Sequence, residues 1–135
     1  MLRKNAKIEL IAGVPLFEKA SKRELAQVAA LADELSLPAG RKLATEGALG
    51  HEFVVIVEGA ADVKRGGKVV NRLRAGDFLG EIALVTGRRR TATVTTTEPS
   101  RLLVVSAQAF RSLLRSLPGL QLKVLEALAE RLPAE

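Results

Sequence analysis

The sequence predicts a mainly β fold with flanking helices: a β-roll, that is a jelly-roll-like double-stranded β-helix, with N-terminal helices and two C-terminal helices. Short β-rich pieces, separated by glycine and proline, fill residues 34–105. A helix-capping sequence precedes them within residues 1–33, and two apolar helical stripes follow in residues 106–135. The 135 residues have room for one domain of ordinary size, so we expect a single domain over 1–135.

The N-terminal segment contains a capping box. Ser21 is followed three residues later by Glu24, so each side chain can bond the other residue's backbone amide and start a helix. A shorter helix before it is expected to carry Ile8 and Ile11. The predicted apolar face of the capped helix consists of Leu25, Val28, Ala29, Ala32 and Leu35.

The central region has the two-residue period of β-strands. Gly66 and Gly67 lie between Val63 and Val69, which predicts a two-residue hairpin turn. Residues 91–97 place threonine at every second position, which predicts a strand with a threonine row on one face. In a further predicted strand, Phe53, Val55 and Val57 alternate with Val54, Ile56 and Glu58.

Two helices are predicted after the strands. Ser106 can cap the first, and Pro118 can start the second, which we expect to end at Pro133. The apolar stripes are Phe110, Leu113, Leu114 and Leu117 in the first helix, and Leu125, Leu128 and Leu132 in the second. We expect the leucines of the second helix to pack in the core or in a homodimer interface, with the alternative that one of them covers a bound ligand.

Composition excludes several classes of function. Cysteine is absent and His51 is the only histidine, so we expect no disulfide, no metal site and no cofactor. No nucleophile with a neighbouring base is recognisable, so we expect no enzyme activity. The 21 Lys and Arg against 15 Asp and Glu give a net charge of +6, which is compatible with an anionic ligand.

The same composition bears on partners and location. Tyrosine and tryptophan are absent and only four phenylalanines occur, so we expect no specific nucleic-acid binding. The longest apolar runs are far shorter than a membrane span, and no cleavable leader is recognisable. We therefore expect a cytoplasmic protein without a membrane span.

Residues 76–94 combine one carboxylate with an arginine cluster. Gly80 allows close approach of the backbone to a ligand, and a short helix beginning near Glu81 would direct its free N–H groups at an anion. Arg90 can pair with two phosphate oxygens. A carboxylate beside a phosphate is tolerable if it accepts a hydrogen bond from a hydroxyl of the same ligand, such as a ribose 2′-OH.

This stretch resembles the phosphate-binding cassette of cyclic-nucleotide-binding domains, the family of sensor domains in catabolite activator proteins, cyclic-nucleotide-dependent kinases and cyclic-nucleotide-gated channels. Residues 46–59 resemble the family's strand-and-turn signature, with His51 where aspartate is more usual, and residues 11–35 resemble its N-terminal helices. Many members have proline where this chain has Arg89. The matched cassette residues are Gly80, Glu81, Ile82, Ala83 and Leu84, followed by Arg90, Thr91 and Ala92.

The resemblance implies a role for each ligand-binding candidate. In the family, the residue matching Glu81 holds the ribose 2′-OH and the residue matching Arg90 pairs with the cyclic phosphate. Backbone N–H groups around Ile82 and Ala83 supply further phosphate donors, and Thr91 is compatible with either purine. Arg88 and Arg89 compete with Arg90 for the phosphate role, and the spacing to Thr91 and Ala92 favours Arg90. We expect the other two arginines to be exposed and to add to the positive electrostatic potential without contacting the phosphate. We expect His51 to be a surface turn residue.

We therefore expect a stand-alone regulatory module that binds a 3′,5′-cyclic nucleotide, cAMP in preference to cGMP, and signals to an effector protein by moving its C-terminal helices. Two alternatives remain. The chain could be the sensor of a larger transcription regulator, channel or kinase. It could also be a docking module that keeps the fold without binding, although Gly80, Glu81 and Arg90 are all present.

Overall fold

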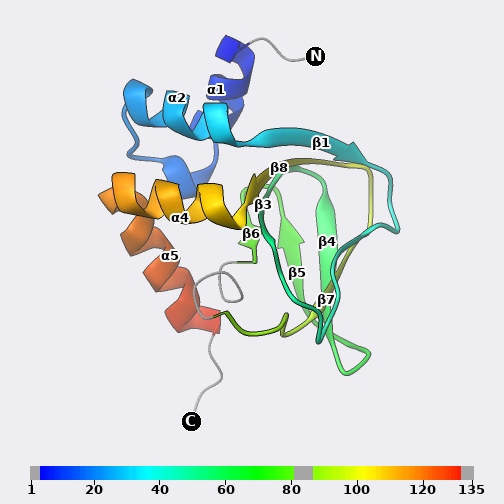
Figure 1. The fold of residues 1–135 in the computed structure, drawn as a ribbon. Coiled ribbons are helices and arrows are strands. Elements are labelled where there is room, and N and C mark those ends of the chain that lie inside the picture. The colour runs from blue at the N-terminus through cyan, green and yellow to red at the C-terminus, as the bar shows by residue number, and fades with distance from the viewer. Residues whose placement is uncertain (1–3, 81–86, 132–135) are drawn as a thin grey trace.

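The computed structural model describes residues 4–80 and 87–131. In this part of the chain, strands occupy the middle of the sequence and helices occupy both ends (Figure 1). The helical elements are α1 (Lys4–Ala12), the 3-10 helix η1 (Pro15–Phe17), α2 (Lys22–Leu31), α4 (Ala107–Ser116) and α5 (Pro118–Arg131). The strands are β1 (Asp33–Leu37), β2 (Lys42–Ala44), β3 (Glu52–Glu58), β4 (Ala60–Arg65), β5 (Lys68–Arg74), β6 (Phe78–Leu79), β7 (Thr93–Thr96) and β8 (Ser100–Ser106).

The described strands form two four-stranded antiparallel sheets. Sheet A has the strand order β1-β8-β3-β6, and sheet B has the order β2-β7-β4-β5. Neighbouring strands come from distant parts of the sequence, as where Asp33 of β1 lies opposite Val104 of β8. Such connections are those of a jelly-roll-like β-roll, which confirms the predicted fold class.

Sheet A separates two apolar cores. Phe53 and Val55 of β3 pack with the helices, whereas Val54 and Ile56 pack against the strands of sheet B. The helices lie on one side of sheet A and sheet B lies on the other (Figure 1). The predicted two-residue period of β3 therefore separates one core from another, and both faces of the strand are buried.

The N-terminal prediction holds except at its last position. Ser21 and Glu24 form the predicted capping box at the start of α2, and Ile11 is buried. Leu35 was predicted on the buried face of α2, and this prediction is wrong, because Leu35 belongs to β1 and its side chain is 44% exposed. Pairing with Leu102 of β8 draws this segment into sheet A instead.

The hairpin is confirmed, and the threonine row is confirmed only for Thr93 and Thr95, because β7 is shorter than predicted and leaves Thr91 and Thr97 outside the strand. Gly66 and Gly67 connect β4 to β5 with φ of +59° and +80°, the left-handed conformation that a type I′ turn requires. In β7, Thr93 and Thr95 are half-buried while Val94 and Thr96 are buried. The two sets thus lie on opposite faces of the strand.

The start of α4 also follows the prediction. The Ser106 hydroxyl accepts a hydrogen bond from the Ala109 amide at 3.1 Å, and Phe110 and Leu113 are buried. Leu117 ends the helix with extended backbone angles, and α5 begins at the next residue. The two helices are therefore separated by a break in the backbone rather than by a continuous bend.

Leu125 of the predicted α5 stripe is 66% exposed, so the prediction that it packs in the core is wrong, while a place in a homodimer interface or over a ligand stays a prediction. The helix buries Leu120 and Val124 instead, because these residues face α4 and η1. The side chain of Leu128 and the whole of Leu132 lie outside the described part of the chain. Within that part, no helix is both long and apolar enough to cross a membrane.

Candidate ligand-binding site

The candidate site lies where three loops meet beside the start of β3. The turn at residues 46–50 faces the segment at residues 88–93, and Gly80, which follows β6, lies beside Arg90 and the Glu52 carbonyl. The Arg90 amide donates to the Ala48 carbonyl at 2.7 Å, and the Arg90 carbonyl accepts from the Gly47 amide at 2.9 Å. Arg90 is thus fixed through its backbone before any ligand is considered.

The Arg90 guanidinium is half-buried between two glycines. Its Nη2 donates a hydrogen bond to the Glu52 carbonyl at 2.7 Å. A Cβ atom added at Gly50 would overlap the guanidinium, and one at Gly80 would overlap the Glu52 carbonyl and lie 2.6 Å from Nη1. Both glycines therefore provide the space that this side chain occupies. Gly80 also has a φ of +102°, which disfavours any residue with a side chain.

The sequence-predicted site residues divide into two groups. Gly80, Arg90, Thr91 and Ala92 are described, and of these Gly80 and Arg90 are in direct contact. Ala92 is buried, while Thr91 is exposed and its carbonyl accepts a hydrogen bond from Arg65 Nε at 3.1 Å. The remaining three, Glu81, Ile82 and Ala83, lie outside the described residues.

The neighbouring arginines were predicted to be exposed and not to contact the ligand phosphate. Arg88 and Arg89 are exposed, but Arg89 Nη1 donates a hydrogen bond to the Gly47 carbonyl at 3.0 Å. That neither arginine contacts the ligand phosphate stays a prediction. The bond adds to the links between the segment that carries Arg90 and the turn at residues 46–50.

Sequence reasoning missed two members of the site. Gly50 was treated as a break between strands, and Glu52 was not singled out, although its carbonyl orients the Arg90 guanidinium. The nearby His51 is exposed as expected, and its carbonyl accepts a hydrogen bond from the Ala107 amide at 2.8 Å. Adjacent carbonyls of one short segment thus contact Arg90 and the first residue of α4.

The arrangement is suited to binding an anion. The Glu52 carbonyl can hold the guanidinium plane in place while itself carrying no charge, and a guanidinium presents its N–H groups as a rigid fork to two phosphate oxygens. The loops around it are joined by backbone hydrogen bonds, so the side chain starts from a fixed position. Preorganisation of this kind lowers the cost of binding.

Comparison with known proteins agrees with this geometry. Residues 34–116 match the family described as "Cyclic nucleotide-binding domain". A cAMP-dependent protein kinase regulatory subunit of Mycosarcoma maydis is 39% identical in an alignment of 116 positions that covers 79% of this chain and 22% of that protein. The chain thus spans about a fifth of the length of this relative.

Solved structures share the fold at lower identity. The regulatory domain of Toxoplasma gondii PKA with cAMP superposes with a TM-score of 0.82 at 22% identity, covering 94% of this chain and 50% of that one. The regulatory subunit of a cAMP-independent protein kinase A from Trypanosoma brucei also gives 0.82, at 20% identity, covering 95% and 45%. With the family match over most of its length, the chain belongs to the cyclic nucleotide-binding domain family.

Proposed function

We propose that this chain is a regulatory module that binds a 3′,5′-cyclic nucleotide, cAMP in preference to cGMP, and catalyses no reaction on it. The observation that carries the proposal is the position of the Arg90 guanidinium, which lies between Gly50 and Gly80 and is oriented by the Glu52 carbonyl. A fixed, permanently charged fork is what a cyclic phosphate, with its single negative charge and two free oxygens, requires.

The rest of the ligand would be held by the segment that follows Gly80. Glu81 would accept a hydrogen bond from the ribose 2′-OH, and the amides of Ile82 and Ala83 would donate to the phosphate. These roles come from the family resemblance. The left-handed backbone at Gly80 supports them, because it lets the chain turn close to Arg90 just before this segment.

The preference for cAMP is supported by the relatives. The 39% identical protein is named as a cAMP-dependent kinase regulatory subunit. Thr91 is compatible with either purine and does not favour one of them.

Calorimetric titration with cAMP, cGMP and 5′-AMP tests the proposal. We expect one site per chain, tightest for cAMP, and weak binding of 5′-AMP, whose open phosphate carries a second charge and a different shape. Tighter binding of cGMP would contradict the preference, and no binding of either cyclic nucleotide would contradict the function.

Ligand binding would be reported by α5. This helix is separated from α4 by the break at Leu117, and a hollow of about 250 Å³ lies between α5, η1 and the start of α2. An exposed ion pair of 3.6 Å between Lys123 and Glu18 spans the same region, and such pairs contribute at most about 1 kcal/mol. The backbone break at Leu117 supports a helix that rotates when the nucleotide binds, with Leu120 and Val124 kept packed, and so presents a changed surface to an effector protein.

A sensor inside a larger protein is the second candidate. The chain spans 22% of its kinase-subunit relative, so the same site could regulate a transcription factor, a channel or a kinase. The proposed binding chemistry is identical in each case. A docking module that binds no cyclic nucleotide is the third, and the likeness to a structure titled as cAMP-independent shows that this fold alone does not determine the ligand.

A further inference from the structure

The two sheets carry opposite charge. The strands of sheet B hold six cations and one carboxylate, a balance of +5, whereas those of sheet A hold one cation and four carboxylates, a balance of −3. The net charge of the whole chain is +6. The sheet B cations are Lys42, Lys64, Arg65, Lys68, Arg72 and Arg74.

Strand register places most of these cations on the outer face of sheet B. Ala61, Leu73 and Val94 point inward to the core, so the residues between them point outward. One cross-strand row consists of Lys42, Thr95, Asp62 and Arg72, and a second row consists of Thr93, Lys64 and Val69. We call the surface formed by these two rows and Arg74 the basic sheet face.

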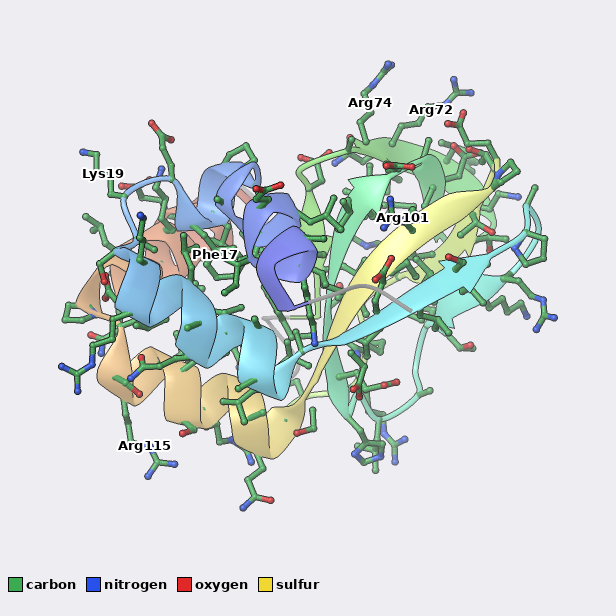
Figure 2. All side chains as sticks on the ribbon, turned by 90° about the horizontal axis from the view of Figure 1, so that it is seen from above. Phe17, Lys19, Arg72, Arg74, Arg101 and Arg115 are labelled. Atoms are coloured by element: carbon green, nitrogen blue, oxygen red, sulfur yellow. The ribbon has the colours of Figure 1, made fainter. Side chains whose placement is uncertain are left out.

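No described helix covers the basic sheet face, because the helices lie on the far side of sheet A (Figure 1). Figure 2 shows Arg72 and Arg74 projecting from the strand end of the molecule, away from the labelled residues of the helical side. Lys42 and Lys64 are exposed as well. All four cations are therefore accessible to a partner.

Only one of these cations is paired within the described part of the chain. Arg72 lies 3.2 Å from the Asp62 carboxylate. No ion pair is formed there by the side chains of Lys42, Lys64 or Arg74. Sheet A differs, because hydrogen bonds from Arg101 to Glu34 and Glu58 compensate its one cation, and the bond to Glu34 raises the pKa of Arg101.

We propose that the basic sheet face docks an acidic protein segment in which apolar residues alternate with carboxylates. Val69, which lies opposite Lys64 in the face, is 49% exposed and can contact an apolar side chain of a partner. A nucleic-acid phosphate backbone has no apolar group that would use this contact. No aromatic side chain is available for stacking on bases, since the four phenylalanines are buried or half-buried and Tyr and Trp are absent. These features favour a polypeptide over nucleic acid.

The partner would bind across the face rather than extend sheet B as a fifth strand. One edge of sheet B is β2, which is only three residues long, and the other is β5, where the amides of Arg72 and Arg74 already donate to the side chains of Asn71 and Asp77 at 2.8 Å. These side chains occupy positions that an added strand would need. Contact through Lys42, Lys64 and Arg74 side chains remains, and it is expected to weaken with salt.

The test uses a fluorescein-labelled short peptide of alternating glutamate and valine, with the glutamine version of the same peptide as control. Fluorescence anisotropy with the full chain at about 50 mM and about 300 mM salt gives the affinity and its salt dependence. The variant Lys64→Glu with Arg74→Glu reverses charge on the face, and Lys19→Glu with Arg115→Glu makes the same change in net charge on the helical side (Figure 2). Circular dichroism and cAMP titration establish that both variants keep the fold and the nucleotide site.

We expect the acidic peptide to bind the wild-type chain, and the sheet variant to lose about tenfold or more in affinity while the helical variant loses less than about threefold. Equal losses in both variants would mean attraction to net charge alone and would overturn the proposal. It would also be overturned by equal binding of the glutamine peptide, or by tighter binding of duplex DNA or phosphatidylserine vesicles than of the acidic peptide. The wild-type chain and both variants should have the same cyclic-nucleotide affinity. A negative result with the acidic peptide would therefore not contradict the proposed function.

Discussion

Replacing Gly50 by alanine is expected to damage the ligand site without damaging the fold. The added methyl group would overlap Nε and Cζ of Arg90, and both atoms belong to the end of a flexible side chain. Gly50 does not have the positive φ that makes alanine unfavourable at Gly80. The guanidinium must therefore move away from its position, while the backbone around it can stay where it is.

The size of the effect follows from the contacts at stake. A displaced guanidinium loses charge-assisted hydrogen bonds to the cyclic phosphate, each worth about 1.5–3 kcal/mol, so cAMP affinity should fall by about 10- to 150-fold. The free energy of unfolding should fall by only about 0.5–2.6 kcal/mol. Loss of the bond from the charged Arg90 guanidinium to the Glu52 carbonyl costs about 1.5–3 kcal/mol, and replacing glycine by alanine recovers about 0.4–1 kcal/mol through the unfolded chain.

Calorimetry measures the affinity, and urea denaturation measures the stability. Gly119→Ala is the matched control, because a Cβ at that position meets nothing within 4 Å and neither quantity should fall. Combining Gly50→Ala with Arg90→Ala should cost no more affinity than Arg90→Ala alone, since the first change acts only through the second residue. Gly80→Ala should lower both affinity and stability, because its methyl group would meet the Glu52 backbone. Wild-type affinity in Gly50→Ala would refute the assigned position of the guanidinium.

Three further predictions concern the nucleotide. Arg90→Ala should weaken cAMP binding by about 2–5 kcal/mol, and Arg89→Ala, which loses a bond to a carbonyl, by less than about 0.7 kcal/mol; equal losses in calorimetry would mean that the phosphate ligand is misassigned. Wild-type protein should bind 2′-deoxy-cAMP about one to two decades more weakly than cAMP, and Glu81→Ala should bind the two almost equally; wild-type indifference to the 2′-OH would remove the role given to Glu81. Saturating cAMP should slow amide hydrogen exchange both at residues 80–92 and in α5, and protection confined to the first region would exclude α5 as the responding element.

Features of the fold that depend on a few adjacent residues could be predicted from the sequence. The capping box at Ser21 and the turn at Gly66 are local, since the residues that form them are within three positions of each other. The alternation in β3 is local too, but its meaning is not. Whether Val54 faces water or a second core depends on sheet B, whose strands come from other parts of the chain.

Sequence reasoning could propose the charged residues of the site but could not identify the backbone groups that position Arg90. Arg90 could be proposed because a guanidinium is a distinctive phosphate ligand and because its spacing to Thr91 and Ala92 matches the family motif. The Glu52 carbonyl could not, because every residue carries a carbonyl and only the folded loops determine which one meets Arg90. Gly50 left a signal, as a second glycine three residues after Gly47, but the sequence does not show that its missing side chain makes room for a residue forty positions later.

The apolar pattern of the last helix is compatible with burial of either of two faces. Leucine spacing favoured the side with Leu125, whereas contacts with α4 and η1 bury Leu120 and Val124. Fully burying two such side chains contributes about 3–6 kcal/mol, so complete separation of α5 from η1 would need a ligand that binds the separated form about two to four decades more tightly. A smaller rotation about the break at Leu117 keeps both side chains packed and costs less. Leu125 is already exposed, so such a rotation could bring it toward a purine without first removing it from the core. We therefore expect the α5 response to be a rotation with its buried face retained, in which hydrogen exchange slows in the helix without any ligand-induced loss of protection in η1.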